Sequence, residues 1–450
     1  MEQMSYKRKP RPNIFTTNSM SEITFIEEVL WKGGLAFTEH LLNSTTMKKF
    51  LENDYNFDLV ICEDFIQEAF YMLSHKYQAP LIVVTPYGNS MKQLFMVGNP
   101  LQLSTVLYEF VAIEDPTSFA GRLKNLYVSA YEFIFWRYRY LDKQEQLVKK
   151  YIKNLPQPVP SLYDIQKNAS LFLINSHFSF DVPVAYQPNI IEVGGLHVAH
   201  SDDVLPQDLK RILSESKHGV IYVNFGSNVK SSELPGDKKR ALLNTFNKLQ
   251  HTVLWKWEED YMEDKPNNVI IRKWFPQSAV LAHPNVKLFI THGGLMSTQE
   301  AIYHGVPLVG VPIFADQFNN ILLAEQAGFG RVLQYEQLND KNVDRVINEV
   351  LRNESYKQRA IEVSYRFKDR PMTPLNLAIY WIEYVLRNNG AEFMKSPGLR
   401  MSWLAYYMID IYILTFVMMS VILWILIKGF KLLFYKELNK KRCNTKQKIS

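Results

Sequence analysis

The sequence predicts an α/β protein with two Rossmann-like domains, followed by one transmembrane helix. Three observations support this fold class. Short apolar strands alternate with helical segments, polar clusters follow several of the strands, and a long uncharged stretch precedes a basic C-terminus. Alternation at this spacing is typical of a doubly wound parallel sheet. We place the first domain at 1–198, the second at 199–390, the transmembrane helix at 404–427 and a basic tail at 428–450.

The second domain shows the clearest pattern, over residues 219–335. Runs rich in Val, Ile and aromatic residues, separated by amphipathic segments, indicate buried strands between helices. The predicted strands are 219–225 (GVIYVNF), 253–257, 269–273, 288–291 and 308–313, and the predicted helices are 238–249, 297–303 and 318–326. A further amphipathic helix is expected at 374–387.

The first domain has a weaker pattern of the same kind. Strands are predicted at 57–62 (FDLVIC), 81–85 and 171–174, with helices at 23–30 and 67–75. The polar stretch 197–207, which contains one proline, is the best boundary between the two domains.

The C-terminal stretch is the clearest topological signal. Residues 411–427 contain no charge, and aromatic residues flank them on both sides. Such a segment suits a short membrane span, although a buried core helix is the alternative. The basic tail places the C-terminus in the cytosol by the positive-inside rule. Lys446 and Lys448 resemble a dilysine retrieval signal, so we expect a single-pass endoplasmic-reticulum membrane protein with a luminal body.

Charge distribution and cysteine content argue against a nucleic-acid-binding protein and against a zinc site. The whole chain carries +6, but residues 428–450 hold eight basic residues and one acid, a formal +7, which leaves −1 for residues 1–427. A nucleic-acid partner needs a basic folded face, and we expect none. Cys443 lies in the basic tail, so we expect no structural disulfide between it and Cys62, and the two cysteines lack the spacing of zinc ligands.

Other sequence signals agree with a luminal body. Three sequons mark Asn43, Asn168 and Asn353 as candidate glycosylation sites. Residues 1–15 are basic and lack an apolar core, so no signal peptide is expected there. Either the start of the protein is missing or the chain enters the membrane by another route.

Four polar clusters follow predicted strands of the second domain. Ligands of open parallel sheets bind beyond the carboxyl ends of the strands, so the four clusters are expected to meet. They are Gly226-Ser227-Asn228, the segment 274–277 (WFPQ), the segment 291–294 (THGG) and Asp316-Gln317.

These clusters offer partners for each part of a nucleotide sugar. Gly294 and the helix that starts after it favour a phosphate, and His292 and Ser297 can donate hydrogen bonds to it. Trp274 offers a flat face for a base and Gln277 an amide for its edge. The ribose suits Glu300, and the sugar suits Asp316 and Gln317. Taken singly, each residue has a structural explanation such as a turn, a core side chain or a helix cap.

The run from 274 to 317 resembles the donor-binding signature of UDP-glycosyltransferases. Its elements are WFPQ, LAHP, FITHGG, STQEA, GVPLVGVPIF and ADQ. The resemblance extends to NSHFSF, PNIIEVGGLH and the membrane tail, and is greatest to arthropod members. It implies the two-domain GT-B fold, a UDP-sugar as co-substrate, and neither a metal nor a further cofactor. It also implies that Trp274 stacks on uracil, that Gln277 contacts the nucleoside, and that His292, Ser297 and Ser227 line the diphosphate. Glu300 would hold the ribose, and Asp316 and Gln317 would read the sugar.

The same resemblance exposes departures from the family. The first unit of the first domain, which carries the catalytic histidine, does not appear in the sequence, so the catalytic base cannot be named. Glu63 aligns with the acid that orients that histidine and is the candidate orienting residue. Met296 stands where many non-animal relatives have Asn, so one donor contact is expected to be missing.

Two functions therefore remain open. The first is transfer of a hexose or hexuronic acid, from UDP-glucose or UDP-glucuronate, to a hydroxyl of a small lipophilic acceptor with inversion. The second is a catalytically inactive UDP-sugar-binding membrane protein that regulates a partner, because the histidine segment is missing. Membrane lipid is an expected partner, as is a homo- or hetero-oligomer with relatives. The choice between the sugars is open, with a lean towards UDP-glucose.

Overall fold

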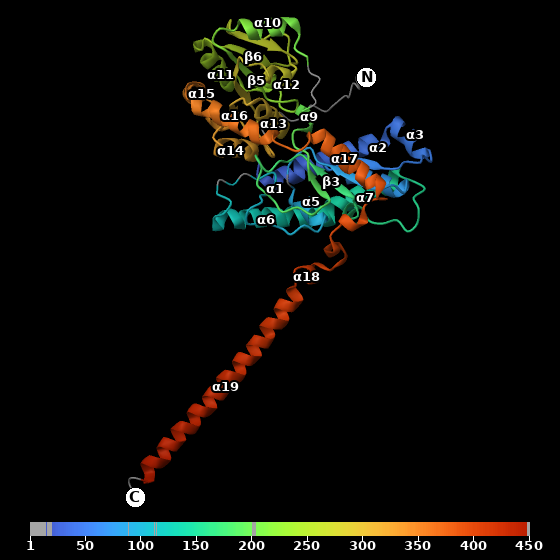
Figure 1. Cartoon of the computed structure of the whole chain (residues 1–450), viewed down its shortest axis with the longest axis vertical. Helices are drawn as coiled ribbons and strands as arrows, with labels where there is room; N and C mark the ends of the chain where they lie inside the picture. The colour runs from blue at the N-terminus through green and yellow to red at the C-terminus, as the bar shows by residue number, and fades with distance from the viewer. Residues whose placement is uncertain are drawn as a thin grey trace. The chain divides into compact units, whose positions relative to one another are not determined.

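The structure is a computed structural model that describes residue 15 and residues 20–88, 90–111, 113, 115–199 and 204–447, without the side chains of 199 and 440–447. It contains two compact units, Met1–Lys395 and Ser396–Ser450. The first unit holds both predicted α/β domains, each built on its own parallel sheet (Figure 1).

The first sheet has four parallel strands in the order β1-β2-β3-β4. Its strands are β1 (Val60–Glu63), β2 (Leu81–Val84), β3 (Leu171–Ile174) and β4 (Ile190–Glu192). The three predicted strands are confirmed, with β1 shifted towards the C-terminus. The sequence did not predict β4, because it has only three residues and ends on a glutamate.

Helices cover this sheet, and several begin with a serine whose side chain accepts from an amide of the first turn, the usual N-cap arrangement. The predicted helix 23–30 contains a π-helix, and 67–75 begins as a 3₁₀ turn. The helices are α1 (Glu22–Thr24), η2 (Phe25–Trp31), α2 (Lys32–Asn43), α3 (Thr45–Glu52), η3 (Glu68–Tyr71), α4 (Met72–Lys76), α5 (Met91–Met96), α6 (Phe119–Phe135), η4 (Trp136–Tyr140), α7 (Leu141–Tyr151) and α8 (Leu162–Lys167).

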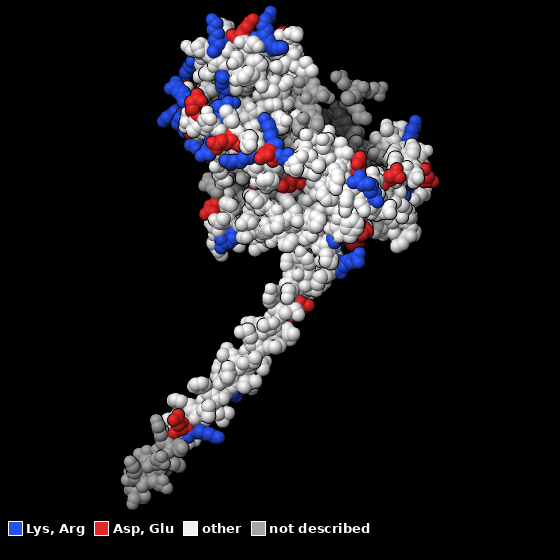
Figure 2. Space-filling model, in the orientation of Figure 1, with Lys and Arg blue, Asp and Glu red and all other residues white. Residues whose placement is uncertain are grey.

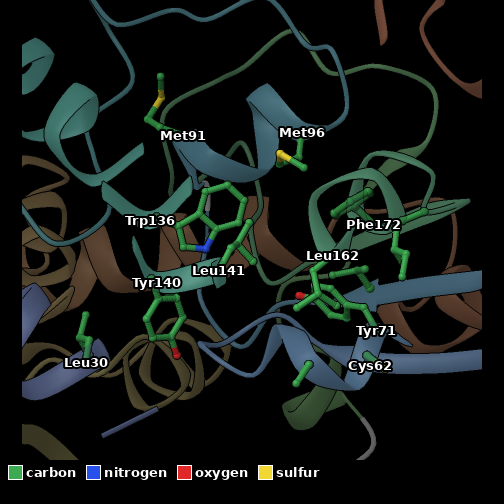
Figure 3. Close-up of a cluster of buried hydrophobic side chains, with 14 of the residues drawn as sticks. Leu30, Cys62, Tyr71, Met91, Met96, Trp136, Tyr140, Leu141, Leu162 and Phe172 are labelled. Carbon is green, nitrogen blue, oxygen red and sulfur yellow. The ribbon is translucent and has the colours of Figure 1, made fainter. Parts of the chain in front are cut away.

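The main core of the first domain lies between β1–β3 and these helices. Figure 3 shows Trp136 and Tyr140 of η4 together with Leu141 of α7 and Phe172 of β3, all at most 2% exposed. Burial of such large aromatic groups supplies most of the driving force for packing. This core also encloses several charged groups, among them Asp64, Glu68 and Lys92.

The second sheet has six parallel strands in the order β10-β9-β8-β5-β6-β7. This is the doubly wound order, with its topological switch point between β5 and β8. Its strands are β5 (Val220–Asn224), β6 (Thr252–Lys256), β7 (Val269–Arg272), β8 (Val286–Thr291), β9 (Leu308–Gly310) and β10 (Gly330–Val332). The five predicted strands are confirmed, while β10 escaped prediction because it is short and contains an arginine.

Helices pack on both faces of this sheet (Figure 1). Helices α11 and α15 cover one face and α10, α12, α13, α14 and α16 the other, so the strands are apolar on both sides. The bounds are α9 (Leu196–Ala199), α10 (Gln207–Glu215), η5 (Ser231–Glu233), α11 (Gly236–Lys248), α12 (Gln277–Leu281), α13 (Leu295–His304), α14 (Gln317–Gln326), η6 (Tyr335–Gln337), α15 (Asp340–Arg352) and α16 (Glu354–Lys368).

The chain returns to the first sheet after α16. Helix α17 (Pro374–Arg387) has the predicted bounds, and Ala378 and Val385 pack with Leu171 and Leu173 of β3. The short turn η7 (Glu392–Met394) extends this contact. Part of the predicted domain boundary, residues 200–203, lies outside the described residues.

The second unit contains η8 (Pro397–Arg400), α18 (Trp403–Tyr406) and α19 (Ile409–Gln447). Within the described residues, one helix is long and apolar enough to cross a membrane, over Ile409–Asn439. This assignment rests on its length and composition alone. Figure 2 shows this helix as largely uncharged, whereas basic and acidic side chains mix on the visible face of the first unit.

Candidate functional site

The candidate site is built at the switch point between β5 and β8. The imidazole of His292, directly after β8, lies against Gly226, which follows β5, and Gly294. A Cβ atom at Gly226 would lie 2.7 Å from Cε1 of His292, and one at Gly294 would lie 2.8 Å from its Nε2. Gly226 also has a φ of +86°, which favours glycine. The two glycines therefore make room for the imidazole, and they let a ligand approach the main chain.

His292 is buried and neutral at physiological pH. Burial, with a contribution from Lys256, lowers its pKa to about 4. Its Nδ1 lies 3.4 Å from the hydroxyl oxygen of Thr291. A neutral imidazole donates one hydrogen bond and accepts another, so a proton on Nε2 would be available to a phosphate oxygen if Nδ1 accepts from Thr291.

The N-terminus of α13 adds a second group for an anion. The helix begins at Leu295, and its N-cap residue, Gly294, has no side chain that could satisfy the first amides. Free amides and the helix dipole at such a position attract negative charge. In the structure, the Leu295 amide bonds to the carboxylate of Asp316. The first amide of α13 is thus used by a carboxylate of the protein itself.

A hydrogen-bond network joins three of the predicted residues. The Nε2 of Gln277 donates to the hydroxyl of Ser297, at 3.0 Å, and to the carboxylate of Glu300. The Oε1 of Gln277 accepts from Asn224 at the end of β5, at 2.6 Å. Side chains from α12, α13 and the end of β5 thus meet in one hydrogen-bond network.

Trp274 and Ser227, two further predicted site residues, are both exposed. Trp274 follows β7 and is 72% exposed, which is unusual for an indole and leaves its face available for stacking. Ser227 lies in the loop after β5 and is also exposed. Met296, in the first turn of α13, is 48% exposed.

Asp316 and Gln317 begin α14, behind a strained turn. Ala315 has a φ of +56°, an uncommon conformation for alanine. The Oε1 of Gln317 accepts from the amides of Ile313 and Phe314, at 2.9 and 3.1 Å, and the side chain is 3% exposed. Burial raises the pKa of Asp316 to about 6, although Asn320 donates to its carboxylate at 2.8 Å.

Glu63 lies at the carboxyl end of β1, in the first sheet, and is exposed. Burial of part of the side chain raises its pKa, while a bond from Gln67 at 3.5 Å opposes this. Among the described residues, no hydrogen bond or ion pair joins Glu63 to the residues of the second sheet. Its neighbour Asp64 is fully buried and accepts from Tyr71 and Gln93.

The three sequon asparagines are exposed. Asn43 ends α2, Asn353 caps α16 through its side chain, and Asn168 accepts from Lys395 at 2.9 Å. Within the described part of the chain, no cluster of three or more His, Cys, Asp or Glu side chains is placed to hold a metal ion. Glycosylation and metal independence stay predictions.

The sequence did not predict two residues that organise the site. The buried ammonium of Lys256, at the end of β6, donates to the carbonyl oxygen of Gly226 at 2.9 Å and to Glu258 at 2.8 Å. Asn320 donates to the carbonyl oxygen of Gly293 at 2.9 Å as well as to Asp316. The one sequence feature that could have pointed to Lys256 is its place at the end of a strand made of otherwise buried residues.

The site residues also fall within a match to a known family. A sequence profile described as "UDP-glucoronosyl and UDP-glucosyl transferase" matches residues 16–445. UDP-glycosyltransferase UGT5 of Dactylopius coccus is 37% identical over 381 residues, covering 84% of this chain and 71% of the relative. UDP-glucosyltransferase 2 of the same organism is 35% identical over 367 residues, covering 82% of this chain and 70% of the relative.

A solved structure supports the fold independently. CalG4, the calicheamicin glycosyltransferase, superposes with a TM-score of 0.55 at 20% identity, over 82% of this chain and 85% of that chain. At this identity the likeness concerns the arrangement of the two α/β domains. It agrees with the two parallel sheets and with the predicted GT-B class.

Proposed function

This chain belongs to the family of UDP-glucuronosyl and UDP-glucosyl transferases, and we propose that it transfers a hexose or hexuronic acid from UDP to a hydroxyl of a small lipophilic acceptor. The transfer inverts the anomeric centre. UDP-glucose is the favoured donor, because a relative that shares 35% of the aligned residues is named a UDP-glucosyltransferase.

One observation carries the proposal: His292 and the amides at the start of α13 converge at the switch point of a doubly wound sheet. A diphosphate there accepts from Nε2 of His292 and from the first amides of the helix, with Ser227 on the facing loop. These donors stabilise the negative charge that grows on UDP as the bond to the sugar breaks.

The remaining donor contacts follow the hydrogen-bond network. The exposed ring of Trp274 stacks on the uracil, and Gln277 meets the edge of the base. When UDP binds, Glu300 gives up the hydrogen bond from Gln277 and accepts hydrogen bonds from the ribose hydroxyls instead. Asp316 and Gln317 bind hydroxyl groups of the sugar.

The acceptor enters through a pocket that both sheets line. It encloses about 760 Å³ of empty space, part of it open to solvent, between loops that follow β2 and β3 and the helix α14. Its lining is mainly apolar, which suits a lipophilic molecule. Asp316 lies on its wall, so the sugar and the acceptor hydroxyl meet there.

The reaction is a single displacement. The acceptor oxygen attacks the anomeric carbon, the bond from that carbon to the diphosphate breaks, and UDP leaves with the electron pair. The hydroxyl proton must pass to a base, a role to which no residue of this chain is assigned. Glu63 is the candidate that orients this base. We further propose that no metal takes part.

Helix α19 anchors the protein in the endoplasmic-reticulum membrane, with the body in the lumen and the basic tail in the cytosol. Contact with membrane lipid follows from this anchor. Because the chain belongs to this family, we also propose that it forms homo-oligomers, or hetero-oligomers with related proteins.

The test is a transfer assay on the full chain in detergent, with UDP-glucose or UDP-glucuronate, a phenolic acceptor and EDTA. We expect glycoside formation, with faster turnover from UDP-glucose, and loss of at least 100-fold in the Asp316→Ala variant. UDP binding without any transfer would favour the inactive, regulatory alternative. Absence of UDP binding would contradict both.

A further inference from the structure

The acceptor pocket contains a carboxyl group that the donor site does not use. Glu109, in the loop after α5, lines the pocket and is 8% exposed. Ser90 donates to its carboxylate, but its Oε2 has no hydrogen-bond partner among the described residues. A buried oxygen in this state is destabilising, and a ligand's donor group would recover the lost hydrogen bond.

The nearest cation cannot satisfy this oxygen. Lys92 is 5% exposed and lies 3.3 Å from Glu68 and 3.7 Å from Asp64, both fully buried. Its single charge is already balanced by these two carboxylates. Glu132, 7% exposed, adds a further acid to the cluster. As far as the structure describes this region, the surroundings of Glu109 are therefore acidic, with no cation to spare for an anionic ligand.

The charged side chains that line the pocket are acidic, like the surroundings of Glu109. Its acidic side chains are Glu109, Asp181 and Asp316, and the described lining residues include no lysine, arginine or histidine. Asp181 uses its oxygens within the protein, accepting from Ser176 at 2.9 Å and from the Val182 amide at 2.8 Å. Glu109 is thus the acid of the lining that still has an oxygen to offer.

Glu109 and Asp316 both line the pocket, and burial raises the pKa of each carboxyl. Among the described residues, no acidic side chain contributes to the raised pKa of Asp316, which burial alone explains. Burial likewise raises the pKa of Glu109 to about 7, and Lys92 opposes this. In either protonation state the Glu109 carboxyl keeps an oxygen that can accept a hydrogen bond.

We propose that Glu109 selects acceptors that carry a second hydrogen-bond donor, a hydroxyl or an amine, in addition to the hydroxyl that receives the sugar at Asp316. This inference rests on the proposed function and specifies its substrate class. Apolar molecules with one hydroxyl leave Oε2 unsatisfied and bind poorly, because a site that hydrogen-bonds a ligand group discriminates strongly against analogues that lack it. Carboxylic acids are rejected by the acidic lining.

The test compares 2,7-dihydroxynaphthalene with 7-methoxy-2-naphthol, which has nearly the same shape but no second donor. Binding of each to the UDP-loaded full chain is measured by calorimetry, and kcat/KM by the transfer assay. We expect the diol to be favoured at least tenfold in both measurements, beyond the twofold statistical factor of its two equivalent hydroxyls. A carboxylate analogue, 7-hydroxy-2-naphthoic acid, should bind more weakly than either.

Two variants assign the preference to Glu109. In Glu109→Leu the ratio should fall to about two, while UDP affinity stays unchanged. In Glu109→Gln, which keeps a carbonyl oxygen that can accept, the preference for the diol should persist. A ratio near two in the unmodified protein, or a tenfold ratio that survives in Glu109→Leu, would overturn the inference. UDP binding distinguishes failure of this inference from failure of the proposed function. If the unmodified protein does not bind UDP, the proposed function itself is refuted.

Discussion

The Nε2 of Gln299, in α13, donates a hydrogen bond to the main-chain carbonyl of Asn175 at 3.1 Å. This bond joins α13 of the second domain to the carboxyl end of β3 in the first. The Oε1 of Gln299 accepts from the Gly195 amide at 3.0 Å, and the side chain is 1% exposed. The helix whose first turn forms the anion site is therefore fastened, through one glutamine, to the first domain.

Gln299→Ala should destabilise the protein by about 2–4 kcal/mol, because it leaves a buried carbonyl and a buried amide without partners. Melting temperature in detergent measures this. Gln299→Glu is the matched variant: it keeps the bond from Gly195 but faces the Asn175 carbonyl with an oxygen, so it should also destabilise. Unchanged melting of both variants would show that this bond does not hold the two domains.

Gly226→Ala should weaken UDP binding at least tenfold, because the added methyl group would lie 2.7 Å from the imidazole of His292. Calorimetry with UDP measures the loss. In a His292→Ala background the same change should cost less, since the space is then empty. Gly236→Ala is the control, because a Cβ there meets nothing within 4 Å. Equal losses in both backgrounds would contradict the close packing of this glycine on the imidazole.

Gln277→Glu should lose more UDP affinity at pH 8 than Gln277→Ala. The new carboxylate would face that of Glu300, to which the Gln277 amide now donates. The difference between the variants should shrink at pH 5, where one of the acids takes up a proton. The exchanged pair, Gln277→Glu with Glu300→Gln, restores one amide and one carboxylate and should regain part of the affinity. No recovery in that pair would argue against a direct contact.

Asp316→Asn should stabilise the ligand-free protein at pH 7 while abolishing transfer. Burial raises the pKa of Asp316 in the folded state to about 6, above its ordinary value of 3.8. The folded state therefore holds the proton more tightly, and its stability falls as pH rises from about 4 to about 6. The gain in the variant should be about 1–3 kcal/mol at pH 7 and should vanish near pH 4. A gain independent of pH would refute the assignment.

Much of the second domain could be predicted from the sequence, because its strands are buried on both faces and read as continuous apolar runs. The strands β4 and β10 could not, since three residues with a charge among them carry no periodic signal. The π-helix at Phe25–Trp31 was predicted as an ordinary helix, because its apolar spacing is close to that of an α-helix.

Part of the candidate site's geometry also follows from sequence reasoning. The strand-end rule singled out the segment that contains Gln277, and the structure joins Gln277 by hydrogen bonds to Ser297 and Glu300 of the helix that follows the THGG segment. The rule could not reveal that Lys256 supports the Gly226 loop, because a strand-end lysine is ordinarily solvent-exposed. The buried Glu109 likewise depends on tertiary packing that no local pattern encodes.

The central claim is that four strand-end segments, distant in the sequence, surround one UDP molecule. Hydrogen–deuterium exchange of the full chain with and without UDP tests it most directly. We predict slower exchange in the presence of UDP within 225–228, 274–278, 292–298 and 314–320, and little change in α11 and α15. Protection confined to other segments, or no protection at saturating UDP, would contradict the account.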